Sequence, residues 1–161
     1  MVTKETIWKY LEAVPDPEVP VLSIVDLGIV RSVDIDKDVI TITITPTYSG
    51  CPAMKHIEQA ILEEMQQNNL RNIAIETVLS PAWTTDWMSE SGKKKLEAYG
   101  IAPPVDEPDK SVLFGPKPIV PCPKCKSKST RLVSQFGSTS CKALYQCESC
   151  QEPFEYFKCL K

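Results

Sequence analysis

Two C-x-x-C pairs stand out in this sequence, Cys122 with Cys125 and Cys147 with Cys150, and 21 residues separate them. A tight turn at each pair would aim two thiolates at one point, and two such turns complete a tetrahedral site for a structural metal ion. The spacing favours Zn²⁺, although iron, as a single ion or as a cluster, uses the same four sulfur ligands. We predict a four-cysteine metal site, and a segment this short needs the metal in order to fold.

A fifth cysteine, Cys51, stands alone between two periodic segments. Residues 39–45 alternate apolar and hydroxyl side chains, which predicts a half-buried strand, and residues 52–68 carry the apolar stripe of an amphipathic helix. Pro52 suits the first helical position, so Cys51 should lie at a helix N-terminus, where unpaired amides and the helix dipole favour the thiolate. The thiol is therefore a candidate nucleophile or metal ligand, and the alternative is a small buried apolar residue.

Polar side chains from three loops are candidates to join Cys51 in that site. Thr47 precedes the cysteine in the same loop, Asp16 and Glu18 follow the first predicted helix, and Asp26 precedes the first predicted strand. If the loops share one end of the sheet, these groups would surround the thiol. The alternative is that the carboxylates only stabilise turns.

A nucleophilic enzyme would also need a base close to Cys51. His56 is the only histidine, and it lies about 140° around the predicted helix from the cysteine, so it should face solvent. The sequence has no glycine-rich nucleotide fingerprint and no paired carboxylate-histidine motif for a di-iron site. The question of enzymatic activity stays open, and a non-catalytic role fits better.

The periodicity of the first hundred residues predicts the element order α-β-β-α-β. Thr3 caps the first helix, a turn at residues 36–38 joins two strands into a hairpin, and a third strand follows the amphipathic helix at residues 73–78. Such an order gives an α+β fold in which helices pack on one face of a small open sheet. Another helix is expected at residues 91–99, and Trp83 and Trp87 are expected to cover the core.

The tail is predicted to form a β zinc ribbon with strands at residues 130–136, 141–146 and 153–159. If the second C-x-x-C turn joins antiparallel strands, Cys141 faces Cys159, and this second thiol pair could pack, oxidise or contribute to a cluster site. Six prolines between residues 102 and 121 predict a semi-rigid linker. The predicted domains are therefore residues 1–101, a linker at 102–121, and a ribbon at 122–161.

Composition and charge exclude several classes of protein. The apolar runs are far shorter than the roughly 20 residues that cross a bilayer, and the first residues lack an apolar signal core, so we expect a cytoplasmic protein. Residues 1–116 carry 10 Lys and Arg against 18 Asp and Glu, whereas residues 117–161 carry 8 against 3. The acidic first part argues against nucleic acid as the main partner.

Three short motifs in the first hundred residues resemble the iron–sulfur assembly family that includes the SufT-type proteins and the eukaryotic cytosolic targeting factor. They are Asp16-Pro17-Glu18, Asp26-Leu27-Gly28 and Gly50-Cys51-Pro52, in matching order and spacing. Members often carry two threonines before the Gly-Cys-Pro element. Here Thr47 fits the first, and Tyr48 replaces the second.

The whole chain resembles the PaaD family, through the stretches at residues 45–53, 83–87, 136–139 and 141–145. The resemblance implies an accessory protein of the multicomponent phenylacetyl-CoA epoxidase in aerobic phenylacetate degradation. It implies assembly or delivery of an iron–sulfur cluster or iron to a partner subunit, above all the iron–sulfur flavin reductase. The candidate residues for transient binding of this iron or cluster are Cys51, Thr47, Asp16, Glu18 and Asp26. The alternative is a non-catalytic structural subunit of the epoxidase complex. The oligomeric state stays open, and a homodimer is one of the possible states.

Overall fold

A computed structural model describes residues 1–105 and 118–159, and the chain divides into two compact units, Met1–Gly92 and Lys93–Lys161. The first unit contains the helices α1 (Lys4–Glu12) and α2 (Met54–Gln67) and the strands β1 (Val30–Asp36), β2 (Val39–Ile44) and β3 (Ile73–Thr77). This is the expected α-β-β-α-β order. No helix among the described residues is both long enough and apolar enough to cross a membrane.

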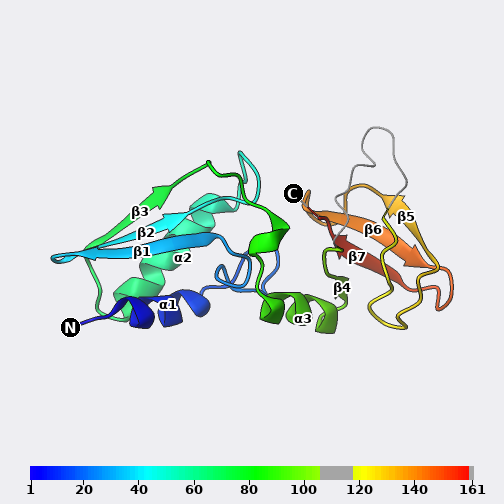
Figure 1. Ribbon diagram of the computed structural model, residues 1–161, viewed down its shortest axis with the longest axis horizontal. Coiled ribbons are helices and arrows are strands. Elements are labelled where there is room, and N and C mark those ends of the chain that lie inside the picture. The colour runs from blue at the N-terminus through cyan, green and yellow to red at the C-terminus, as the bar shows by residue number, and fades with distance from the viewer. Residues whose placement is uncertain (106–117, 160–161) are drawn as a thin grey trace. The chain divides into compact units, whose positions relative to one another are not determined.

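The sheet of the first unit has the strand order β1-β2-β3. β1 and β2 form the predicted antiparallel hairpin, and β3 runs parallel to β2 after the crossover through α2. Figure 1 shows both helices on the same side of this sheet. One side of the hairpin is therefore covered, in agreement with the alternating pattern of the sequence.

Burial follows the two sequence periodicities. The isoleucines of β2 at positions 40, 42 and 44 are at most 5% exposed, while the threonines between them are only half-buried. α2 buries Ile57, Ile61 and Met65 on one face. Thr3 caps α1 as expected, because its hydroxyl accepts a hydrogen bond from the backbone of Thr6 at 3.3 Å.

Hydrogen bonds beyond the strands hold three loops at one end of this sheet. The backbone of Thr45, just after β2, donates to the carbonyl of Ile29 at 2.9 Å, and the backbone of Val78, just after β3, donates to Ile44 at 2.9 Å. The loop before β1, the loop after β2 and the loop after β3 are therefore neighbours. The central position of β2 places the Cys51 loop between the other two.

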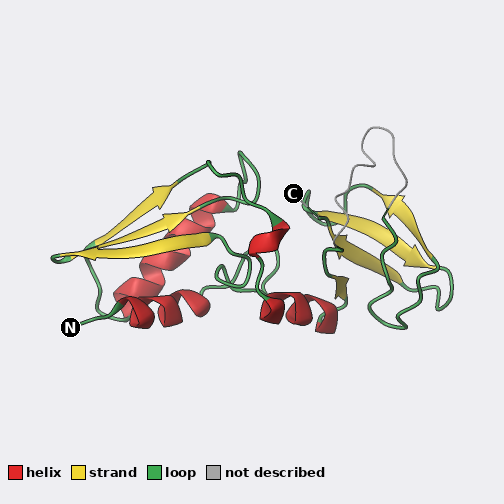
Figure 2. Ribbon diagram, viewed as in Figure 1, coloured by secondary structure: helices red, strands yellow, loops and turns green. Residues whose placement is uncertain are grey.

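A 3₁₀ turn (Thr85–Trp87) and α3 (Glu90–Ala98), which runs across the division between the units, follow β3. The second unit has a four-stranded sheet in the order β4-β7-β6-β5, drawn in yellow in Figure 2. Its strands are β4 (Ile101–Ala102), β5 (Thr130–Ser134), β6 (Lys142–Cys147) and β7 (Pro153–Phe157). The three predicted ribbon strands are present, while β4 is an addition that the sequence pattern did not indicate.

The second unit begins before the proline-rich segment. Ala102 of β4 pairs in parallel with Tyr156 of β7, and the Thr130 hydroxyl donates to the carbonyl of the fully buried Val120 at 2.7 Å. The sequence-based boundary at residue 101 thus falls inside a stretch that the structure assigns to the second unit. Residues 106–117 of the predicted linker lie outside the described part of the chain.

Candidate functional site

Each C-x-x-C pair of the second unit lies in the same type of turn. The backbone of Cys122 donates to the carbonyl of Ser127, and the backbone of Cys147 donates to the carbonyl of Glu152, both at 2.9 Å. The residue four positions after each of these cysteines, Lys126 and Gln151, adopts a positive φ of 63°. Two matching turns therefore present their cysteine pairs to each other.

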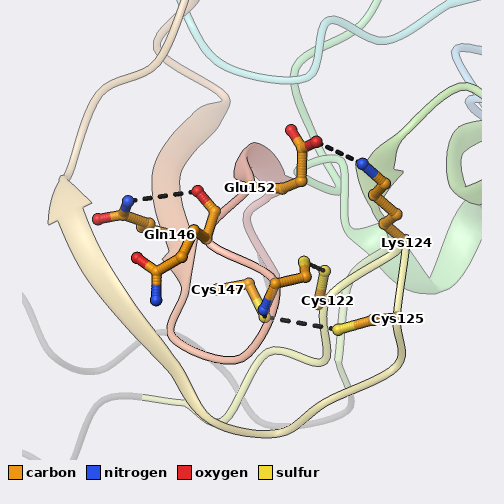
Figure 3. A network of polar contacts seen from close by, with 8 residues as sticks. Cys122, Lys124, Cys125, Gln146, Cys147 and Glu152 are labelled. Carbon is orange, nitrogen blue, oxygen red and sulfur yellow. Dashed lines mark hydrogen bonds and ion pairs between the residues drawn. The ribbon is translucent and has the colours of Figure 1, made fainter.

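The four sulfurs converge as they would around one tetrahedral ion. The Sγ atoms of Cys122 and Cys150 are 3.8 Å apart, those of Cys125 and Cys147 are 3.5 Å apart, and all four lie within 4.8 Å of one another (Figure 3). A metal–sulfur bond of ~2.3 Å in a tetrahedral site gives sulfur–sulfur separations of about 3.8 Å. The fold therefore brings the four predicted ligands together in an arrangement that fits a metal ion.

The surroundings of Cys147 and Cys150 shift the pKa values of the two thiols in opposite directions. The backbone N–H of Cys150 donates to the sulfur of Cys147 at 3.5 Å and is the main cause that lowers the pKa of Cys147 to about 6. At Cys150 the backbone of Glu152 acts to lower the pKa, but desolvation and the neighbouring sulfurs outweigh it and raise the pKa to about 12. A divalent cation would remove this conflict, because it favours the thiolate at every ligand.

Contacts besides the cysteines join the two turns. The Lys124 ammonium pairs with the Glu152 carboxylate across them, and the hydroxyls of Ser127 and Ser149 are 2.7 Å apart. These groups are largely exposed, so each contact contributes little free energy. A bound metal ion would therefore contribute most of the stability of this cluster.

The Cys51 loop of the first unit consists of successive turns. The backbone of Cys51 donates to the carbonyl of Tyr48, and the backbone of Met54 donates to Cys51, both at 3.3 Å. α2 begins at Met54 rather than at Pro52, and no side chain caps it. Cys51 is half-buried, in a loop that leads directly into the first turn of that helix.

The carboxylates of Asp16 and Asp26 are buried and shape the loops that carry them. Asp16 accepts hydrogen bonds from the backbones of Glu18 and Val19 at 2.9 and 2.8 Å. Asp26 accepts from the backbone of Ser23 at 3.1 Å and from the Ser89 hydroxyl at 3.0 Å. The turn-stabilising interpretation thus describes the contacts of both carboxylates, and a ligand role for them stays a prediction.

The Asp26 loop and the Cys51 loop meet at Trp83. The indole N–H of this buried side chain donates to the carbonyl of Leu27 at 2.8 Å, and the same residue lines a pocket together with Thr47. Thr47 and Asp26 therefore lie in neighbouring loops, as expected. Glu18 is half-buried, and His56 is exposed, as its helical position predicted.

Trp87 packs directly on the Asp26-Leu27-Gly28 motif. Gly28 has a φ of +72°, and a Cβ added there would lie 2.3 Å from the Trp87 carbonyl oxygen. The Arg31 guanidinium lies over the indole of the same tryptophan, with its central carbon 3.5 Å from the centre of the ring. Sequence reasoning assigned Trp87 to the core in general and missed this contact, because only the structure shows which backbone it covers.

Substitution of Gly28 by alanine is expected to destabilise the first unit by about 2–4 kcal/mol, the sum of a left-handed backbone penalty and overpacking. Urea unfolding followed by tryptophan fluorescence measures this loss. Gly50→Ala is a matched control, since Gly50 has a φ of +76° but no atom within 4 Å of an added Cβ. An equal loss in both variants would contradict the importance of the Trp87 contact.

The expected pairing of Cys141 with Cys159 is wrong by one residue of register. β6 and β7 pair Lys142 with Phe157, and the backbone of Lys158 donates to the carbonyl of Cys141 at 3.0 Å, so Lys158 faces Cys141. A one-residue shift moves a side chain to the other face of a sheet. Both cysteines are buried, and a joint role for them stays a prediction.

Known protein families match segments in both units of the chain. The family model described as "Iron-sulfur cluster assembly protein" matches residues 4–69, and the one described as "PaaD zinc beta ribbon domain" matches residues 106–158. An Escherichia coli K12 protein, named as a subunit of a "Putative 1,2-phenylacetyl-CoA epoxidase", is 50% identical over 154 residues, which are 96% of this chain and 92% of that protein. The chain belongs to the PaaD family.

The first unit of this PaaD family member also resembles shorter proteins. The Bacillus subtilis "Fe-S protein maturation auxiliary factor YitW" is 39% identical over 95 residues, covering 58% of this chain and 92% of that protein. A solved DUF59 domain from Bacillus anthracis has 32% identity and a TM-score of 0.55, covering 58% of this chain and 90% of that one. The α+β fold predicted for the first unit is therefore confirmed.

Proposed function

We propose that this protein is an accessory factor of a phenylacetyl-CoA epoxidase that holds an iron–sulfur cluster or iron transiently at Cys51 and delivers it to a partner subunit. The observation that carries the proposal is the position of Cys51. It is the single cysteine of the first unit, it is half-buried in the loop before α2, and this unit resembles iron–sulfur maturation factors. Thr47, Asp16, Glu18 and Asp26 would position the loop and its cargo.

A single thiol suits a carrier rather than a permanent cluster site. Resident clusters in proteins are held by four ligands, most often cysteines. With only Cys51 in the first unit, the remaining ligands must come from a second copy of this chain, from a small thiol or from the recipient. Incomplete coordination by the carrier leaves the cargo exchangeable, which transfer requires.

Anaerobic reconstitution and transfer would test the proposal. The purified protein would be loaded with iron and sulfide, freed of excess reagents, and mixed with the epoxidase reductase from which the cluster has been removed. We expect the absorbance of the cluster to appear first on the carrier. After mixing, it should appear on the reductase instead. Failure of the protein to retain iron above the level found with thiols in buffer would contradict the proposal.

For the four-cysteine site we propose Zn²⁺ with a structural role. The four ligands are protein sulfurs, which leaves no open coordination position for a substrate. The metal would hold the two turns together and allow the ribbon to fold. Metal analysis of protein purified with and without oxygen distinguishes zinc from iron, because only iron content would depend on the handling.

A second candidate is a non-catalytic structural subunit, favoured by an exposed aromatic side chain of the ribbon. Phe136 is 66% exposed, yet Lys158 contacts its ring at 4.7 Å and also donates to the carbonyl of Gln135 at 3.0 Å. An aromatic side chain that is already fixed by such contacts suits a protein interface, because little conformational entropy is lost when a partner binds it. A structural subunit would copurify in equimolar amount with active oxygenase, whereas a maturation factor becomes dispensable once the cluster is loaded.

A further inference from the structure

β5 lies at the edge of the four-stranded sheet of the second unit, and β6 is its only partner among the described strands (Figure 1). The outer side of an edge strand presents unpaired backbone N–H and C=O groups, which can bind a further strand. Many native edges are protected from this by proline or by several charges. β5 contains no proline and carries a single charge, at Arg131. Within the described part of the chain, this edge is therefore open to pairing.

Two exposed apolar side chains accompany the edge. A bulge in β5 leaves Val133 outside the regular pairing with β6, and this side chain is 49% exposed. Phe136 follows shortly after the strand and is 66% exposed. The Lys158 ammonium lies 4.7 Å from the centre of the Phe136 ring, so the exposed ring is held in place. The edge therefore offers apolar contacts beside its backbone groups.

The charges around β5 favour an acidic occupant. Three cations of the ribbon already form ion pairs with glutamates, namely Lys124, Lys126 and Lys142. Lys128 and Arg131 are exposed, and no carboxylate among the described residues pairs with either of them. One lies two residues before β5 and the other at its second position. Cations that are available to a partner therefore follow the open edge.

We propose that this edge binds an extended acidic segment of a partner protein, which adds to the sheet as a strand beside β5. Backbone hydrogen bonds to β5 would supply affinity, as in other cases of strand addition. Carboxylates of the segment would pair with Lys128 and Arg131, and its apolar side chains would contact Val133 and Phe136. This interaction does not involve Cys51, so it goes beyond the proposed function of the first unit.

The same features argue against a nucleic acid as the occupant. Nucleic-acid sites rely on several cations that contact successive phosphates, whereas glutamates already neutralise three cations of the ribbon. Open backbone groups and an exposed valine contribute nothing to phosphate binding, but both suit a peptide. The combination of edge, apolar side chains and cations therefore selects an acidic peptide segment.

Titration of the full chain with three synthetic peptides, followed by amide NMR signals, tests the proposal. Each peptide has about ten residues, enough to span one strand. In the first, Glu alternates with Val; the second carries Lys in place of Glu; the third carries Pro in place of Val and lacks the backbone N–H groups at those positions.

We expect the Glu-Val peptide to shift the signals of residues 128–136 and to slow hydrogen exchange of the β5 amides. It should bind at least about tenfold more tightly than the Lys-Val peptide, because two exposed ion pairs are replaced by two like-charge contacts. Absence of these shifts, or equal affinity for these two peptides, would overturn the proposal. Equal affinity for the Glu-Pro peptide would overturn strand addition.

Variants separate this surface from other parts of the chain. Lys128→Gln combined with Arg131→Gln should weaken binding of the Glu-Val peptide about fivefold and reduce its dependence on salt. Lys9→Gln is the matched control, since it removes an exposed cation of α1 in the first unit. Unchanged affinity in the double variant would overturn the role of the two cations. Cys51→Ser should bind the peptide as the wild type does, so failure of cluster binding would not be confused with failure of this edge.

Two further measurements distinguish the peptide segment from other occupants. A single-stranded oligonucleotide that shifts the signals of residues 128–136 at lower concentration than the Glu-Val peptide would overturn the proposal in favour of nucleic acid. A dimer of the chain that the peptide dissociates would overturn the assignment to another protein, because a second copy would then occupy the edge. A monomer that binds the peptide and not the oligonucleotide is the expected result.

Discussion

Replacement of Cys147 by serine is expected to remove the metal and unfold the ribbon while the first unit stays folded. The sulfur of Cys147 is fully buried and lies 3.5 Å from that of Cys125, so its loss leaves three ligands around the ion. Zinc bound to four such ligands contributes about 10–16 kcal/mol of apparent free energy to the folding of small zinc domains. A loss of this size is comparable to the whole free energy of unfolding of a typical domain, about 5–15 kcal/mol, so the ribbon should unfold.

Metal content and amide NMR spectra of the purified variant would show the effect. Signals of residues 118–159 should collapse to the narrow range of an unfolded segment, and those of residues 1–92 should keep their positions. Ser149→Ala is the matched control, since Ser149 lies in the same turn, is exposed and is no metal ligand. A full complement of metal in Cys147→Ser would show that other residues hold the ion.

The second large effect is expected for Cys51→Ser, which should abolish the support of phenylacetyl-CoA epoxidation that the proposed function assigns to this protein in cells. Serine has nearly the same size, so the turns of the loop and the four-cysteine site should survive. The hydroxyl is a poor ligand for iron and clusters, which prefer thiolates. Cluster content of the reductase should fall to the level found in cells that lack this protein.

Absorbance and iron content of the reductase and oxygenase from the same cells would locate the loss. His56→Ala is the control, because the only histidine of the chain lies near the same loop but is exposed. Full epoxidation with Cys51→Ser would favour the structural-subunit candidate instead. A folded variant with unchanged metal in the ribbon would exclude a trivial loss of stability.

The sequence predicted those parts of the fold that depend on local pattern. The period-two alternation of β2 and the apolar stripe of α2 are local, and so are the turns at the four cysteines, since each follows from neighbours along the chain. The convergence of two distant C-x-x-C pairs was also predictable, because sulfur ligands spaced in this way have one common use. For these reasons the four-cysteine cluster was the feature that the sequence predicted most directly.

The remaining features depend on contacts that no local pattern encodes. The offset of Cys141 from Cys159 arises from the turn between β6 and β7, where one residue more or less changes the register. The buried hydroxyl of Thr45 has no hydrogen-bond partner among the described residues, yet in the sequence it looked like one more polar residue of an alternating strand. The bond from Trp83 to Leu27 joins residues that are 56 positions apart. Such contacts follow from the packing of the completed fold.

The pairing of β4 with β7 has a consequence for how the chain can be divided. Because Ile101 and Ala102 belong to the same sheet as the last strand, the residues on both sides of positions 106–117 are held together by more than the peptide chain. A protease cut within 106–117 should therefore leave the two fragments associated on a sizing column.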